Sequence, residues 1–238
     1  MQGIIDFHSH ILPGMDDGSR SPEESVAMLR MEAEQGIGHV IATPHFYPQR
    51  DVPERFLERR ARAEAALRKE MEGHTGLPEL RMGAEVFYFH GISQSDAMRE
   101  FAIEGTDCIL IEMPASPWEN TMYRELEQLY NKQGLLPVIA HIDRYIGVFR
   151  DHGIPQRLAK LPVLVQANSG FFLKKTTAPM ALRLLKKNRI HLLGSDCHDL
   201  SSRSPNLEGA VERIRKSLGD RGVAAICGWQ QDILQAGR

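Results

Sequence analysis

Histidine and carboxylate residues stand near both ends of this chain in spacings that suit metal ligands. The sequence DFHSH carries His8 and His10, and the sequence SDCH carries Asp196 and His198. Side chains two residues apart on an extended strand project to the same side, so each segment supplies one pair of ligands. Imidazole and carboxylate groups bind borderline and hard divalent ions. The two segments therefore predict two halves of one metal site.

Further residues of ligand type each follow a short apolar run in the middle of the chain. They are His45, Glu85, Glu112 and His141. Seven apolar runs have strand character, and most of them are nearly continuous, which is typical of parallel strands buried on both faces. They cover residues 3–7, 39–43, 80–84, 108–111, 136–140, 163–167 and 190–194. The carboxyl ends of the strands in a β/α barrel share one rim. We therefore expect these side chains to meet in a multinuclear metal site.

Segments of helical character separate the strands. A helix is expected from Pro22, with Ser21 as N-cap and Gly36 as the stop. Others are expected at 53–71, at 119–132 with Gly134 as the stop, and at 178–187. The alternation predicts one α/β domain over residues 1–238, a distorted seven-stranded (β/α)7 TIM-like barrel. An open doubly wound sheet is the alternative architecture.

Composition excludes several classes of protein. The chain has 238 residues, a formal net charge of -2 and a pI near 6.6, with dispersed basic residues, so we expect no nucleic-acid partner. No apolar run approaches the roughly 20 residues that a membrane helix needs, and the N-terminus does not resemble a signal peptide. We expect a cytoplasmic protein without membrane insertion, whose three scattered cysteines are free buried thiols. Its oligomeric state stays open.

Two acids and two arginines lie close to the expected rim in the sequence. Asp17 is a candidate ligand in the loop after the first strand, whereas its neighbour Asp16 is interpreted as a turn residue. Arg144 and Arg203 follow His141 and His198 closely, and a guanidinium fork matches phosphate oxygens. The other histidines lie away from strand ends and are assigned no role: His39, His74, His90, His152 and His191.

A thiol mechanism also has to be considered. Cys197 and Arg203 show the C-x5-R spacing of cysteine-dependent tyrosine phosphatases, but the segment between them contains no glycine. Cys197 stands between Asp196 and His198, so a strand end that presents those two residues inward turns the thiol away. A nearby carboxylate would raise the pKa of the thiol. We therefore expect no catalytic cysteine.

At these residues the whole chain resembles the bacterial manganese-dependent protein-tyrosine phosphatases of capsule and exopolysaccharide operons, in the polymerase and histidinol phosphatase (PHP) superfamily. The matching segments are 6–19 (DFHSHILPGMDDGS), 43–45 (TPH), 83–85 (GAE), 112–114 (EMP), 140–145 (AHIDRY) and 194–198 (GSDCH). The resemblance implies a PHP-type barrel that hydrolyses phosphotyrosine on a protein, usually a tyrosine autokinase.

The same resemblance implies three divalent ions. The first would be held by His8, His10, Glu85 and Asp196, with Glu85 bridging to a second ion on Glu112 and His141; the third would lie on Asp17, His45 and His198. Arg144 and Arg203 fall where the family's phosphate-binding arginines are found. The resemblance favours manganese, although such ligands also accept iron, zinc or magnesium.

A mechanism and an alternative function follow. Divalent ions acidify water for attack on phosphorus and neutralise phosphoryl oxygens, and the two arginines would stabilise the transferring group. Phe46, Tyr47 and Tyr145 are candidates to receive the phosphotyrosine ring, with core packing as the other reading of each. The alternative is a small-molecule phosphoesterase such as histidinol phosphatase.

Overall fold

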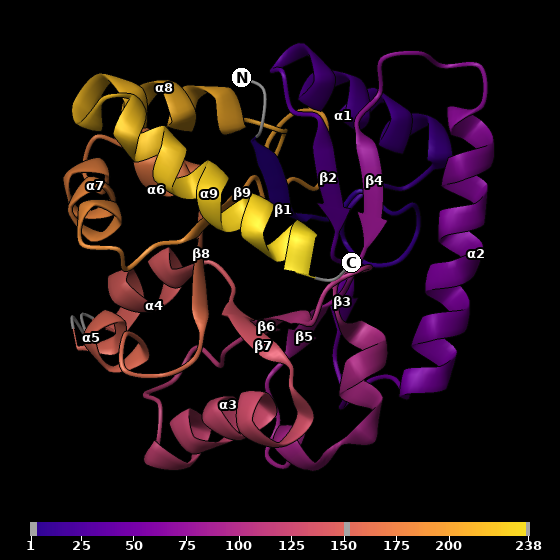
Figure 1. The fold of residues 1–238 in the computed structure, drawn as a ribbon. Coiled ribbons are helices and arrows are strands. Elements are labelled where there is room, and N and C mark those ends of the chain that lie inside the picture. Colours follow the sequence, from indigo (N-terminus) through magenta and orange to yellow (C-terminus); the bar gives the residue numbers. More distant parts are fainter. Residues whose placement is uncertain (1–3, 150–152, 237–238) are drawn as a thin grey trace.

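The computed structural model describes residues 4–149 and 153–236. Its strands are β1 Ile5–Ser9, β2 His39–Ala42, β3 His45–Phe46, β4 Glu79–Met82, β5 Glu85–Phe87, β6 Cys108–Glu112, β7 Leu136–Ile139, β8 Leu164–Asn168 and β9 Leu192–Gly194. All the strand pairs are parallel, in the orders β1-β2-β4 and β3-β5-β6-β7-β8-β9. Figure 1 shows the strands curling around a common centre with helices outside them. The predicted α/β barrel of curled parallel strands is thereby confirmed.

Two of the seven expected strands are interrupted. The run 39–43 ends as β2, and β3 begins at His45 after Pro44, which has no N–H to donate. The run 80–84 ends as β4, and β5 begins at Glu85. The sheet crosses both breaks through backbone bonds, because Gly83 N donates to Ala42 O at 2.8 Å and Glu85 N to Pro44 O at 3.0 Å. The breaks let His45 and Glu85 start new strands at the rim.

The first and last strands join at the rim. Asp196 N donates to His8 O at 2.8 Å, and His10 N donates to Cys197 O at 2.9 Å, around a parallel bridge between Ser9 and Cys197. These bonds connect residues nearly two hundred positions apart. They bring the two candidate ligand segments of the sequence side by side.

A β-bulge interrupts the alternation of side chains in β1. Ile5 and Asp6 pair with His39 and Val40, but the next pair is Ser9 with Ala42, so β1 takes three steps where β2 takes two. An extra residue in one strand breaks the two-residue period. Asp6 and His8 would otherwise point to the same face. The bulge allows them to face opposite sides of the strand.

Helices cover the outside of the sheet. They are α1 Pro22–Glu34, α2 Pro53–Met71, η1 Ile92–Gln94, η2 Asp96–Phe101, α3 Asn120–Gln133, α4 Ile142–Phe149, α5 Ile154–Leu158, α6 Ser169–Leu173, α7 Ala178–Lys186, α8 Leu207–Leu218 and α9 Asp220–Ala236. The four helices expected from the sequence are present. As predicted, the Ser21 hydroxyl accepts from Glu24 N at 3.3 Å to cap α1, and Gly134 ends α3 with φ 66°. The other helices, of which α8 and α9 are the longest, were not predicted from the sequence.

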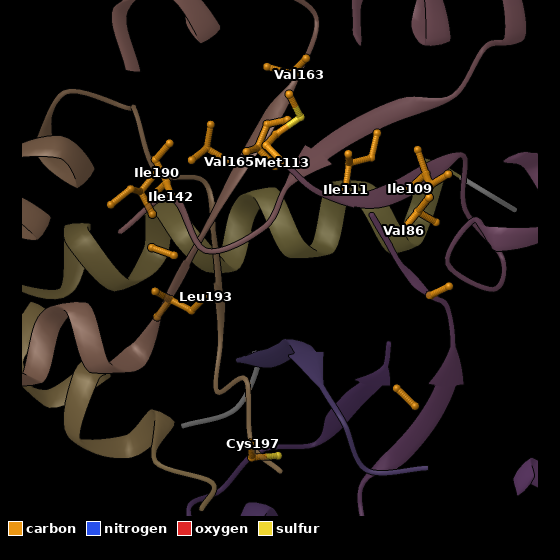
Figure 2. Packing of buried hydrophobic residues seen from close by; sticks show 14 of the residues in the cluster. Val86, Ile109, Ile111, Met113, Ile142, Val163, Val165, Ile190, Leu193 and Cys197 are labelled. Carbon is orange, nitrogen blue, oxygen red and sulfur yellow. The ribbon is translucent and has the colours of Figure 1, made fainter. Parts of the chain in front are cut away.

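The core has two parts. Inside the strands, residues such as Phe7, Leu110 and Leu192 form one cluster with Ile233 of α9, whose neighbour Gln230 also bonds the backbone of Ile5. Figure 1 shows α9 crossing this end of the barrel. Outward-facing strand residues and the helices form the larger cluster, part of which Figure 2 shows. Because α9 covers this end of the barrel, the opposite rim, at the carboxyl ends of the strands, is left for chemistry.

The described residues contain no helix both long and apolar enough to span a lipid bilayer.

Candidate metal centre

Four predicted ligands, His8, His10, Glu85 and Asp196, converge in one place. Glu85 Oε2 lies 3.1 Å from His8 Nε2 and 3.2 Å from His10 Nε2, and these two nitrogens are 3.1 Å apart. Asp196 Oδ1 lies 3.7 Å from His8 Nε2 and 3.4 Å from His10 Nε2. All four side chains are buried. The set implied for a first ion is therefore assembled in one place.

The other oxygen of Glu85 faces a second group. Its Oε1 lies 2.7 Å from His141 Nε2, which is 3.7 Å from Glu112 Oε1. His45 approaches the same acids from another side, with Nδ1 3.0 Å from Glu85 Oε2 and 3.8 Å from Glu112 Oε2. The two carboxylate oxygens thus face different sets of ligands. A carboxylate placed in this way can bridge two ions.

A third group lies around Asp17. Its Oδ1 is 3.4 Å from His198 Nε2 and 3.8 Å from His45 Nε2, and the ligand atoms of His10, Asp17, His45 and His198 all lie within 4.8 Å of one another. His10 thus borders both the first and the third group. The structure brings all nine predicted ligands together, while their assignment to particular ions stays a prediction.

Electrostatics make the cluster attractive to cations. Burial alone would raise the pKa of Glu85 and of Asp196, but His8 and the other imidazoles bring both well below their ordinary values. Conversely, burial would lower the pKa of His8, and Glu85 and Asp196 raise it instead. The pKa of His198 falls to about 4 through burial and the nearby His10. The ionised carboxylates that favour protonated imidazole would equally favour a metal cation in its place.

Asp16 orients two of the candidate ligands, a role that sequence reasoning missed. Its Oδ2 lies 2.8 Å from His10 Nδ1 and accepts from His45 N at 2.8 Å, while Oδ1 accepts from Gly18 N at 2.9 Å. Burial would raise the pKa of Asp16, yet His10 lowers it strongly. The turn predicted at Asp16 is present, but the side chain is also a buried support for the cluster. Its position beside Asp17 was the available signal.

Strand β8 also contributes residues that sequence reasoning missed. Gln166 Oε1 accepts from His141 N at 2.5 Å and lies 3.4 Å from His8 Nδ1. Asn168 Nδ2 donates to Asp196 Oδ2 at 2.8 Å. These polar residues end an apolar run, which is the pattern that identified the other strands' ligands. Their amides hold three candidate ligands in place.

The two predicted arginines converge on Asp196. Arg144 donates to Oδ2 at 2.8 Å and to Glu112 Oε1 at 3.2 Å, and Arg203 donates to Oδ1 at 2.9 Å. Arg144 remains 40% and Arg203 39% exposed. Burial would lower the pKa of Arg144, but Asp196 and the two glutamates raise it, so the side chain stays charged. Both guanidinium groups are therefore bound to the cluster through Asp196 and remain accessible from solvent.

Backbone strain is concentrated at the rim. His141 has φ 33° and Asp196 has φ 55°, a region that residues other than glycine rarely adopt. Such conformations persist where the surrounding contacts determine them and are enriched at functional sites. Here the strain falls on two candidate ligands.

Cys197 faces away from the cluster, as predicted. Its thiol is fully buried with Asp6 and Glu32, which lie between β1 and α1, and it belongs to the outer hydrophobic core labelled in Figure 2. Burial, followed by Asp6 and Glu32, raises the pKa of the thiol well above its ordinary value. A thiolate nucleophile is thereby disfavoured on grounds of both geometry and charge.

The donor set fits a bound metal. His10 Nδ1 is held by Asp16 and His198 Nδ1 donates to Asp196 O at 2.9 Å, which leaves both Nε2 atoms for the cluster. Metal-binding histidines are typically oriented through their second nitrogen in this way. Among the described residues, His198 Nε2 and Glu112 Oε2 are buried without a hydrogen-bond partner. Divalent cations in the third and second groups would satisfy these two atoms.

The aromatic candidates divide into core and rim. Phe46 is buried and stacks on Phe101 at 4.4 Å, and Tyr145 is buried with its hydroxyl accepting from Met113 N at 2.8 Å, so both residues belong to the core. Tyr47 is half-buried beside His45, with ring centroids 4.9 Å apart. It is the one of the three that stands at the rim.

The histidines without an assigned role lie outside the nine-residue cluster. His191 is buried next to Trp229 and accepts from Val165 N at 3.0 Å, and burial lowers its pKa to about 4. His39, His74 and His90 make contacts elsewhere on the surface. His152 lies outside the described residues.

The fold and the cluster together define a class: a parallel β/α barrel that carries His and carboxylate ligands of metal-binding type at the carboxyl ends of its strands. A family model described as capsular polysaccharide synthesis, CpsB/CapC, matches residues 4–232. The chain belongs to the CpsB/CapC family.

Two relatives make the comparison concrete. The chain is 31% identical over 226 residues to the tyrosine-protein phosphatase YwqE of Bacillus subtilis (strain 168), covering 91% of this chain and 85% of the relative. It is 29% identical over 234 residues to the tyrosine-protein phosphatase CpsB of Streptococcus pneumoniae, covering 91% of each.

Solved structures support the same placement. A chain from the crystal structures of YwqE and CpsB, described as unique metal-dependent tyrosine phosphatases, superposes with a TM-score of 0.86 at 27% identity, covering 98% of this chain and 94% of that one. A D-hydantoinase from Thermus sp. gives a TM-score of 0.51 at 13% identity over 95% of this chain and 68% of its own, a likeness of fold alone.

Proposed function

We propose that the protein is a metal-dependent protein-tyrosine phosphatase of capsular polysaccharide synthesis. The observation that carries the proposal is the orientation of the Glu85 carboxylate. One of its oxygens faces His8 and His10, and the other faces His141. Membership in the CpsB/CapC family and the likeness to YwqE and CpsB support the same activity.

Metal ions at this cluster would supply an acidified water and would neutralise charge on the phosphoryl group. The protein's own residues have separate tasks. Asp16 orients the imidazole of His10, and Gln166 accepts from the backbone N–H of His141 and lies beside Nδ1 of His8, so both residues keep the ligands in place around the phosphoryl group. Arg144 and Arg203 would bind non-bridging phosphoryl oxygens with the donors that are free of Asp196, and would stabilise their charge in the transition state.

We propose three ions, held by the sets named above, with manganese as the resident metal. The three neighbouring groups of ligand atoms support that number. The test is metal analysis of protein purified without added metal, followed by stripping and reloading with manganese, iron, zinc or magnesium. Three equivalents of manganese with the highest turnover would support the proposal, and a single bound equivalent would overturn the trinuclear assignment.

The proposed substrate is phosphotyrosine on a protein, in particular a bacterial tyrosine autokinase of the polysaccharide pathway. Tyr47 would receive the ring in this proposal, which its position at the rim beside His45 supports. The competing function is hydrolysis of a small phosphate ester such as histidinol phosphate. Phosphate release from a phosphotyrosine peptide and from histidinol phosphate, measured with the same manganese-loaded protein, separates the two, and a preference for histidinol phosphate would overturn our choice.

Two expectations from the sequence remain part of the proposal. Residues 1–238 form one catalytic domain, which limited proteolysis tests by the absence of a stable smaller fragment. The protein acts in the cytoplasm, which fractionation of the producing cells tests.

A further inference from the structure

A cleft of about 550 Å³ opens beside His45 and Asp17 at the edge of the metal centre. Tyr47 lines it, together with three arginines from the segment that leads into α2 and from its first turns: Arg50, Arg55 and Arg59. We refer to this space as the arginine cleft. Because it shares His45 and Asp17 with the cluster, a molecule bound at the cluster can extend into it directly.

One acid of the cleft, Asp51, pairs with two of the three arginines. Asp51 Oδ1 accepts from Arg55 Nε at 2.5 Å, and its Oδ2 lies 3.6 Å from Arg59. The guanidinium of Arg50 lies 5.2 Å above the ring of Tyr47 and pairs with no acid in the described part of the chain. Of the three arginines, Arg55 and Arg59 thus share one acid, and Arg50 keeps its guanidinium available to a ligand in the cleft.

The other two acids in the lining are engaged elsewhere. Asp16 is held by His10 and by the backbone N–H groups of Gly18 and His45. Asp17 faces His198 and Arg203. Neither acid pairs with an arginine of the cleft.

Arg59 adds an unused donor. Its terminal nitrogen donates to Met15 O at 3.4 Å, but its Nε is buried and has no hydrogen-bond partner among residues 4–149 and 153–236. A buried charged donor without a partner is costly. An anion in the cleft would satisfy it.

We propose that the arginine cleft is a specificity subsite that binds an anionic side chain next to the phosphotyrosine of the substrate. This inference rests on the proposed phosphatase activity. With the phosphoryl group at the cluster and the ring against Tyr47, a neighbouring substrate residue reaches Arg50 and Arg59. Guanidinium forks bind carboxylate and phosphate oxygens with similar geometry, so glutamate, aspartate or a phosphorylated residue meets the same requirement.

The test compares manganese-loaded protein on phosphotyrosine peptides that differ at the flanking residues: glutamate, glutamine or phosphoserine. The glutamate and phosphoserine peptides distinguish the two sources of negative charge. We expect kcat/KM about tenfold higher for at least one anionic peptide than for the glutamine peptide, mainly through KM, with the preference shrinking at high salt. Calorimetry with non-hydrolysable phosphonate versions of these peptides should show the same ranking in Kd.

Arg50→Gln and Arg59→Gln test the residues. For each variant, the KM for the anionic peptide should approach the KM for the glutamine peptide, so that their ratio approaches one. The ratio of the two Kd values should do the same. Arg50 is exposed, so its substitution keeps the test valid even if loss of Arg59 disturbs folding. Arg62→Gln is the matched control, because Arg62 is an exposed arginine of α2 outside the cleft, and its ratio should equal that of the wild type.

The outcomes separate the subsite from the activity. Hydrolysis of every peptide without preference overturns the subsite and leaves the phosphatase intact. A preference that survives both arginine substitutions also overturns it, because the anion is then recognised elsewhere. Hydrolysis of none of the peptides, with the anionic preference still present in Kd and lost in the variants, overturns the proposed activity and retains the subsite.

Discussion

The two faces of β1 carry groups of similar chemistry in opposite electrostatic states. On one face, Asp6 lies with Glu32 and Cys197 in a fully buried pocket against α1. On the other face, two residues along, His8 lies with His10 and Glu85. Burial raises the pKa of Asp6 and Glu32, whereas histidines lower that of Glu85 despite equal burial.

The difference shows that burial alone does not make an acid into a ligand. Carboxyl groups packed against each other favour the neutral form, and imidazoles beside a carboxylate favour the ionised form. The face with the ionised carboxylates is also accessible from solvent, because Arg144 and Arg203, which pair with Asp196, are half-exposed. The buried face has no comparable opening, since Asp6, Glu32 and Cys197 are each 0% exposed. One face is therefore suited to cations and the other to structure.

The largest effect is expected from Glu85→Ala. Loss of this carboxylate removes a ligand from the first and the second ligand group at once. Phosphatase activity should therefore fall by about a thousandfold or more, and metal content should drop. Glu79→Ala on neighbouring β4, at a 57% exposed side chain, is the control and should retain both. Near-wild-type turnover in Glu85→Ala would refute the bridging role.

Arg203→Ala should give a smaller loss. It removes one charged donor from the transferring phosphoryl group, so kcat/KM should fall by about a hundredfold while metal content stays near that of the wild type. Steady-state kinetics together with metal analysis checks both parts. A parallel loss of metal would mean that Arg203 acts through Asp196, its ion-pair partner at 2.9 Å.

Glu32→Gln tests the buried face through stability. Burial and Asp6 raise the pKa of Glu32 well above its ordinary 4.5, so this group stabilises the fold fully below about pH 4.5 and loses its contribution as pH rises toward the folded-state pKa. The neutral amide does not ionise. The free energy of unfolding of Glu32→Gln relative to wild type should therefore increase by about 1–2 kcal/mol between pH 5 and pH 8. Urea denaturation at matched metal load measures it, and a pH-independent difference would contradict the assignment.

Cys197→Ser should have the smallest effect on chemistry. The thiol faces Asp6 and Glu32 and not the cluster, so turnover should stay within about threefold of wild type, with a stability cost of about 1 kcal/mol for burying a more polar hydroxyl in its place. Turnover with and without a thiol-alkylating reagent checks this. Inactivation of the wild type alone by the reagent would revive the cysteine mechanism.

Sequence reasoning recovered the strands and helices with strong local signals. The N-cap at Ser21 and the stop at Gly134 act within a few residues, and the predicted helix at 53–71 matches α2. The helices α8 and α9 carry weaker local signals and depend on what they cover. The Gln230 side chain of α9, for example, bonds a strand 225 positions away.

The candidate site was likewise predictable in its ligand types and less so in its supports. The spacing of His8 and His10 and the strand-end positions of Glu85 and His141 placed them at one rim. Asp16 was interpreted only as a turn residue, and Gln166 was not singled out, because their roles consist of contacts made in the folded chain, such as the 2.5 Å bond from His141 N to Gln166.

What the sequence by itself determined is the set of chemical groups and the strands that carry them, because apolar runs and residue spacing act locally. Only the tertiary structure decided that Asp6 and His8 face opposite sides of β1. That outcome depends on the bulge against β2, and a bulge is a property of strand pairing. The tertiary structure also turned one oxygen of Glu85 toward His8 and the other toward His141, since that arrangement requires the ends of several strands to meet.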